Sequence, residues 1–103
     1  MRQFDTYENP SQRSRAFAPF VVVLQSHLLA AAPTVVVAPL LRNDGRSAYT
    51  ELSALVVHNG GQYVVSVAEL AAIDARHLQR PAGSLRKYED AIRRALDRLF
   101  TGF

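Results

Sequence analysis

Cysteine is absent from this chain of 103 residues. Disulfide bonds, thiolate nucleophiles and cysteine-based metal sites are therefore excluded, and the chain is compatible with a reducing compartment. Long apolar runs are also absent: the stretches 20–24 and 34–41 have the length of strands, far below the ~20 residues of a membrane-spanning helix. The acidic residues Asp5 and Glu8 interrupt the opening segment, which argues against a signal peptide. We expect a cytoplasmic protein.

A strong excess of charge is missing as well. The chain has 12 Lys and Arg against 9 Asp and Glu, a formal charge of +3. Nucleic-acid-binding proteins usually concentrate Lys and Arg on one face. Here the basic residues gather at Arg13 and Arg15 and again in 86–98, where acidic residues are interleaved with them. The second cluster is typical of a solvated helix face, and we expect no sequence-specific binding of nucleic acid.

Runs of β-branched and aromatic residues predict a series of short strands. The strongest hairpin signal is Asn59-Gly60-Gly61 between two apolar segments, because Asn-Gly supplies the positive φ angles of a tight turn. The segment 68–75 is compatible with a helical turn or a short strand, and 80–83 is predicted to break the chain. The predicted strands lie at 3–7, within 16–26, at 34–38, at 52–58 and at 62–67.

The apolar period changes to that of a helix after Ser84, whose hydroxyl is suited to an N-cap. Gly102 is suited to the C-terminal stop, and Glu89 has the spacing to pair with Arg93. The order β-β-β-β-β-α predicts one domain over 1–103, mainly β within the α+β class. The predicted apolar stripe consists of Leu85, Tyr88, Ile92, Ala95, Leu96, Leu99 and Phe103.

Catalytic and metal-binding patterns are not found. His27, His58 and His77 each stand alone, so we interpret them as surface or strand-end histidines rather than ligands. No serine has the Gly-x-Ser-x-Gly setting of an acyl-transfer nucleophile, and the Asn-Gly-Gly turn lacks the pattern of a phosphate-binding loop. The residues therefore predict no catalytic site, no metal and no cofactor.

Two other features could carry function. The Arg13/Arg15 segment is either a solvated loop or a docking patch for an acidic partner. The last five residues, 99–103, stay apolar to the end, which is unusual for a chain terminus. They are either a helix end packed on the sheet or an interface with a partner.

Several stretches resemble the CcdB family of toxins, in the order in which that family has them. The resemblance covers nearly the whole chain, and it depends on order and spacing more than on any single motif. The matching stretches are Gln3-Phe4 with Tyr7, the run 20–26, Val37-Ala38-Pro39-Leu40, Glu51-Leu52 with Val56-Val57-His58, and Asp90-Ala91-Ile92 with Ala95, Leu99-Phe100 and Gly102.

The resemblance implies an SH3-like barrel-type antiparallel β-domain with a C-terminal α-helix, assembled as a homodimer. It implies the toxin of a type II toxin–antitoxin system, which binds the A subunit of DNA gyrase and traps the enzyme on cleaved DNA. A CcdA-like antitoxin with a disordered segment would neutralise it, without any cofactor or metal. We expect this acidic partner to contact Arg13 and Arg15.

In that family the last three residues contact gyrase, which assigns this role to Thr101, Gly102 and Phe103. Gly102 matches the family's penultimate glycine, and Phe103 replaces an isoleucine. Thr101 stands where the family has a tryptophan, and losing such an anchor typically costs ~2 kcal/mol or more, about thirtyfold in affinity. Phe100 or Phe103 could compensate for this loss.

Two alternatives remain beside a gyrase poison. One is an endoribonuclease toxin of the MazF/Kid type, which shares the barrel fold and could use Arg13, Arg15 or Arg46, although its characteristic motifs are missing here. The other is an inactive relative that still dimerises and binds an antitoxin but has lost the target.

Overall fold

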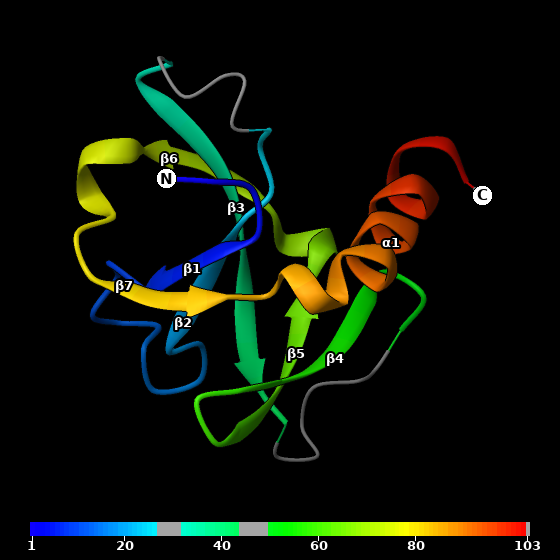
Figure 1. Ribbon diagram of the computed structural model, residues 1–103, viewed down its shortest axis with the longest axis horizontal. Helices are drawn as coiled ribbons and strands as arrows, with labels where there is room; N and C mark the ends of the chain where they lie inside the picture. The colour runs from blue at the N-terminus through cyan, green and yellow to red at the C-terminus, as the bar shows by residue number, and fades with distance from the viewer. Residues whose placement is uncertain (27–31, 44–49, 103) are drawn as a thin grey trace.

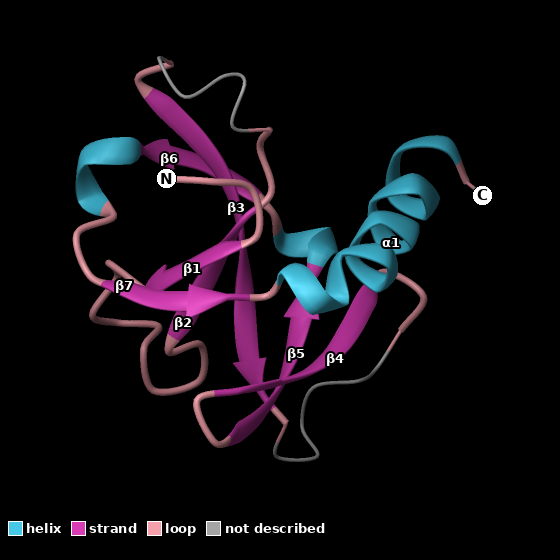
Figure 2. Cartoon of the chain, in the orientation of Figure 1, coloured by secondary structure: helices cyan, strands magenta, loops and turns pink. Residues whose placement is uncertain are grey.

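The computed structural model describes residues 1–26, 32–43 and 50–102. Its strands form one antiparallel sheet in the order β4-β5-β3-β2-β1-β7, with β6 paired to the first half of β3 (Figures 1 and 2). The strands are β1 (Asp5–Glu8), β2 (Phe20–Val23), β3 (Thr34–Arg42), β4 (Ser53–His58), β5 (Gly61–Ser66), β6 (Ala71–Asp74) and β7 (Pro81–Ser84), and the helices are the short η2 (Val67–Glu69), η3 (Ala75–His77) and η4 (Arg86–Tyr88) and the long α1 (Glu89–Thr101).

The long strand β3 continues beyond its predicted end at residue 38, because Pro39 costs the sheet no hydrogen bond. Pro39 lies opposite Val21 on β2, at a position between hydrogen-bonded pairs, so its nitrogen points to the other edge of β3. On that edge, β6 pairs up to Val37 and β5 begins at Leu40. The proline occupies the gap between them, where a missing N–H is harmless.

The predicted Asn-Gly-Gly hairpin is confirmed. Asn59 and Gly60 have φ angles of 49° and 80°, as a type I′ turn requires, and His58 pairs with Gly61 to close the loop. The first strand begins at Asp5 rather than Gln3. The segment 68–75 contains both structures that its sequence allowed, the end of η2 and the strand β6.

The predicted chain break at 80–83 is wrong, because 81–84 form the strand β7. β7 pairs with β1 at the end of the sheet, and the register shifts between Thr6 and Tyr7. Pro81 is its first residue, a position at which an edge strand tolerates proline. Gly83 has a φ of 129°, which lets the strand bend there.

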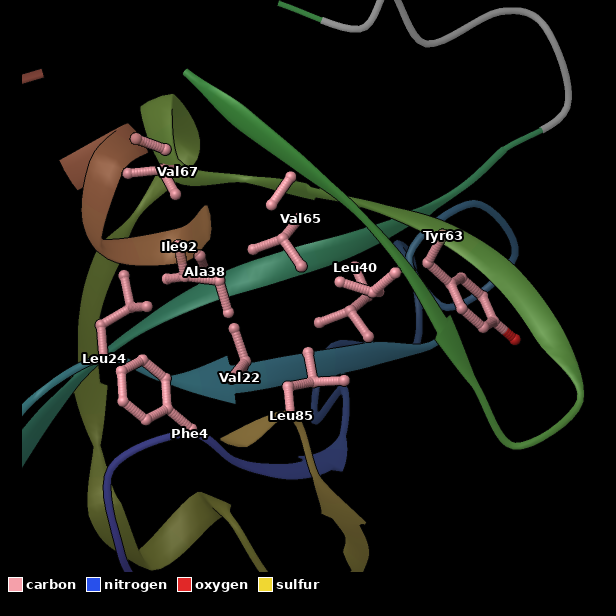
Figure 3. Packing of buried hydrophobic residues seen from close by; sticks show 13 residues of the cluster. Phe4, Val22, Leu24, Ala38, Leu40, Tyr63, Val65, Val67, Leu85 and Ile92 are labelled. Atoms are coloured by element: carbon pink, nitrogen blue, oxygen red, sulfur yellow. The ribbon is translucent and has the colours of Figure 1, made fainter. Parts of the chain in front are cut away.

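Both faces of the sheet are buried, which explains the unbroken valine runs. The larger cluster lies between the sheet and α1 and includes Phe4, Val22, Leu85 and Ile92 (Figure 3). A second cluster on the other face contains Tyr7, Val21, Val23, Val35, Val37 and Leu78. Alternate residues of β2 thus enter different clusters. The predicted fold class, an antiparallel β-domain of α+β type with a C-terminal helix, is confirmed.

The C-terminal helix ends where predicted but begins later, because α1 starts at Glu89 after Tyr88, so the predicted N-cap at Ser84 is wrong for this helix. Ser84 Oγ instead accepts a hydrogen bond from Arg86 N at 3.1 Å, at the start of the short helix η4. Glu89 pairs with Arg93 at 3.4 Å. Gly102 ends the helix in the left-handed conformation, and its N–H donates to the Arg98 carbonyl at 3.1 Å.

Candidate functional site

The free end of α1 presents the predicted target-binding residues. Thr101 and Gly102 are exposed there together, and Phe103 lies outside the described residues. The Thr101 hydroxyl donates to the Asp97 carbonyl at 2.6 Å, so its proton is used within the helix and not offered to a partner. Phe100 is 70% exposed, an unusual position for a large apolar side chain.

Beside this helix end lies an apolar groove, with a volume of about 370 Å³. Its floor continues the larger core cluster, because Leu24 is buried in that cluster and Val36, Leu70 and Leu96 pack against it. Sequence reasoning missed this groove. Its residues are far apart in the chain. Of these residues, the predicted helix stripe contained only Leu96, and Phe100 belongs to the apolar tail 99–103. The groove is lined by Leu24, Gln25, Ser26, Val36, Leu70, Leu96 and Phe100.

The loop that carries Arg13 and Arg15 is held by Asn9. The Asn9 amide nitrogen donates to the Ala18 carbonyl at 2.8 Å and to Ser14 Oγ at 2.9 Å. The Asn9 carbonyl accepts from Arg15 Nε at 2.6 Å. This bond holds the Arg15 side chain in place through its Nε atom. Arg13 and Arg15 are both exposed.

Arg15 lines a second hollow of about 320 Å³, together with Glu8, Pro10, His77, Gln79 and Arg80. Arg80 and Glu8 form a long ion pair of 3.9 Å. The two positive charges of Arg15 and Arg80 outnumber the one negative charge of Glu8, so the hollow attracts anions. Arg13 is not one of its lining residues, so the structure gives the two predicted arginines different surroundings.

The arginine loop and the helix end are separate surfaces. Figure 1 shows the loop after β1 and the C-terminus on opposite sides of the molecule. Because these two surfaces lie on opposite sides, a single compact ligand does not bridge them. They also differ in character, since the helix end is apolar and the loop is basic.

His58 is the last residue of β4, as the strand-end interpretation predicted, and it is buried rather than on the surface. Its exposed fraction is 6%, its Nε2 lies 3.0 Å from Thr6 Oγ1, and its ring meets that of Phe20 edge-on at 5.1 Å. Burial lowers the pKa of His58 below its usual 6.5, and a hydrogen bond with the Ala82 backbone partly opposes this. Its partners are those of a structural residue. The signal was its place in the alternation of Ala54 and Val56, which are also buried.

The other two histidines differ. His77 is exposed on η3, and His27 lies outside the described residues. Within 1–26, 32–43 and 50–102, no cluster of three or more His, Asp and Glu side chains could bind a metal ion. Among the same residues, no helix is long and apolar enough to cross a membrane.

Comparisons with known proteins agree with this architecture. The sequence model of the family described as CcdB protein matches residues 3–102. A solved structure described as a crystal structure of an Mtb toxin superposes with a TM-score of 0.69 at 24% identity, over 81% of this chain and 92% of that one. At this identity it shows a shared fold. No curated protein matches the chain.

Proposed function

The chain belongs to the CcdB family of toxin proteins, and from this premise we propose that it is the toxin of a type II toxin–antitoxin pair that binds the A subunit of DNA gyrase. In this proposal the bound toxin traps gyrase on cleaved DNA, and it does so as an inhibitor rather than as an enzyme. The observation that carries the proposal is the exposed end of α1, where Phe100, Thr101 and Gly102 project beyond the core.

The groove beside α1 supports a homodimer as the active form. Phe100 stands at the rim of this groove with most of its ring exposed. In a two-fold dimer, Phe100 of each copy can enter the groove of the other, which buries apolar surface on both sides. Such a dimer would place the two helix ends close to the symmetry axis, as a paired site for two gyrase chains.

The sequence after Thr101 also bears on the missing tryptophan. Large aromatic side chains dominate interfaces because they bury much area with little loss of conformational freedom. Because the proposed dimer buries Phe100, Phe103 is the aromatic residue that this tail offers to gyrase in place of a tryptophan at position 101.

The antitoxin is proposed to bind the basic loop. Arg15 and Arg80 border the hollow beside Glu8, and Arg13 is exposed on the same loop. Carboxylates of a disordered acidic segment would find charge complementarity there, which speeds encounter and sets register. Reversing the charge of Arg13 and Arg15 should therefore weaken antitoxin binding. Unchanged affinity would contradict this part of the proposal.

The first experiment is a cleavage assay with purified gyrase from the native host, supercoiled plasmid, ATP and this protein. Accumulation of linear DNA linked to gyrase supports the proposal. A variant lacking residues 101–103 should lose the activity while keeping its far-ultraviolet spectrum, because these residues lie at or beyond the end of α1. Full cleavage by the shortened variant, or none by the intact protein, would contradict it. Incubation with RNA tests the endoribonuclease alternative, and intact RNA removes it.

A further inference from the structure

β4 is the first strand of the sheet, and its edge away from β5 offers hydrogen-bonding groups that no strand among the described residues uses. The two-residue loop after His58 makes the His58–Gly61 pair a hydrogen-bonded one, so the backbone groups of Leu55 and Val57 point away from β5. Val57 N donates to the Tyr88 hydroxyl at 3.0 Å. No residue in the described part of the chain bonds to the N–H or C=O of Leu55, or to the C=O of Val57.

The side chains along this edge are apolar and exposed. Leu55 and Val57 are 51% and 53% exposed, and they stand two residues apart on the outer face of β4. They border a hollow of about 350 Å³ that Tyr88, Gln62 and Asn43 complete. An exposed edge with branched aliphatic residues is a template for a further strand unless the protein protects it.

Basic side chains run beside the same edge. Arg98 reaches the Glu51 carbonyl at 3.5 Å, just before β4, and the Lys87 amine lies 5.1 Å from the Tyr88 ring, near its end. Arg94 lies on the same flank of the helix, one turn before Arg98. Asp90 and Asp97 border this flank on its solvent side, one turn before Arg94 and directly before Arg98, and Arg98 is the residue that contacts the segment before β4.

We propose that the β4 edge binds an extended acidic peptide, in which aliphatic and carboxylate side chains alternate. One peptide residue pairs with both backbone groups of Leu55, and its aliphatic side chain, with that of the residue two positions along, packs on Leu55 and Val57. The carboxylates between them point to the other face of the added strand, toward Lys87, Arg94 and Arg98. This is strand addition, in which main-chain hydrogen bonds give affinity and alternate side chains give specificity. A second copy of this chain is disfavoured, because pairing two β4 edges would bring two basic flanks together.

The test uses the full chain and a short synthetic peptide that alternates glutamate and valine. Binding should slow hydrogen exchange at the Leu55 amide, which the peptide backbone would now cover. Two matched peptides separate the contribution of the backbone hydrogen bonds from that of the carboxylate charges. N-methylation of the amides that face β4 should weaken binding about tenfold or more, and lysine in place of glutamate should do the same at low salt.

A double variant, Arg94→Glu with Arg98→Glu, should weaken binding of the glutamate peptide and reverse the preference toward the lysine peptide. Arg2→Glu, distant from β4, is the charge-matched control and should change neither. Equal binding of the N-methylated peptide, or unchanged exchange at Leu55, overturns the proposal. Protection of Leu55 that grows with protein concentration and without peptide also overturns it, in favour of a second copy. Neither gyrase nor antitoxin enters this test, so its result is independent of the proposed toxin function.

Discussion

His58 and Thr6 join the first strand in the order of the sheet to the last but one: Nε2 of the histidine on β4 lies 3.0 Å from Oγ1 of the threonine on β1. The two strands are separated by β5, β3 and β2 in the order of the sheet. The Asn59 side chain adds a hydrogen bond to the Ala82 carbonyl on β7 at 3.1 Å. Side chains thus close the curled sheet where the strands do not pair directly.

Removing the Thr6 hydroxyl should destabilise the protein. In Thr6→Val the shape is kept, but His58 loses its buried partner, so we expect a loss of about 1–3 kcal/mol in the free energy of unfolding. Chemical denaturation measures this loss. Thr34→Val is the matched control, because Thr34 is exposed at the start of β3, and it should have little effect. Equal losses in the two variants would mean that the His58–Thr6 contact contributes nothing.

Stability should also fall in mild acid because of His58. Burial holds the pKa of this residue below its unfolded value of 6.5, so the unfolded chain binds the proton more readily. The contribution of neutral His58 to the free energy of unfolding is complete above pH 6.5. It is lost as the pH falls from there through the lower pKa of His58 in the folded state. Denaturation midpoints across this range, compared with those of His58→Gln, isolate the effect of His58 from that of the other histidines. Parallel pH profiles for the two proteins would contradict it.

Gly83 is expected to resist substitution more strongly than Gly60. Both have positive φ angles, 129° and 80°, but a Cβ at position 83 would lie 3.1 Å from His58 Cε1, whereas nothing lies within 4 Å of one at position 60. Gly83→Ala should therefore cost more than Gly60→Ala, by about 1–3 kcal/mol of backbone strain plus the clash. Thermal unfolding compares them. In a His58→Ala background the difference should shrink, and a constant difference would exclude the clash as its cause.

The contacts of His58 with Thr6 and of Asn59 with Ala82 could not be predicted from the sequence, because they join residues far apart in the chain. The hairpin at Asn59 and the end of the C-terminal helix at Gly102 depend on local chemistry, and both were predicted correctly, whereas the start of this helix lies five residues after the predicted cap at Ser84. β7 was missed because Pro81 and Gly83 resemble a chain break. Only the neighbouring strand β1, about 75 residues earlier, makes them an edge strand.

The candidate sites also differ in whether they are formed by one local segment or by segments far apart in the chain. The sequence left open whether the last residues pack on the sheet or form an interface, and the structure shows Thr101 and Gly102 exposed at the end of α1. The apolar groove and the free edge of β4 are made by residues from separate segments. Their positions depend on the pairing of the whole sheet, which composition and periodicity do not encode locally.

Substitutions at Phe100 and Ile92 should distinguish effects on dimer assembly from effects on folding. Ile92 is fully buried on the inner face of α1, so Ile92→Ala should lower the free energy of unfolding by about 2–5 kcal/mol. Phe100 is mostly exposed, so Phe100→Ser should leave the stability of the monomer within about 0.5 kcal/mol but weaken self-association. Sedimentation over a concentration series measures the second effect. If Phe100→Ser associated like the original protein, the groove beside α1 would not be the dimer contact.

A tryptophan at position 101 should strengthen the proposed action on gyrase. Thr101 is exposed and its hydroxyl bonds only to the Asp97 carbonyl within the described chain, so Thr101→Trp should leave the fold intact. A well-packed aromatic anchor contributes ~2 kcal/mol or more, about thirtyfold in affinity. The concentration that gives half-maximal DNA cleavage by gyrase measures the gain.

Thr101→Val removes the same hydroxyl without adding a ring, and it should match the original protein in this assay. A gain in both variants would attribute the effect to the lost helix bond rather than to the aromatic face. If the tryptophan variant gained nothing while binding of the antitoxin stayed intact, gyrase would not be the target of this helix end. The relative that keeps its antitoxin but has lost its target would then be the better description.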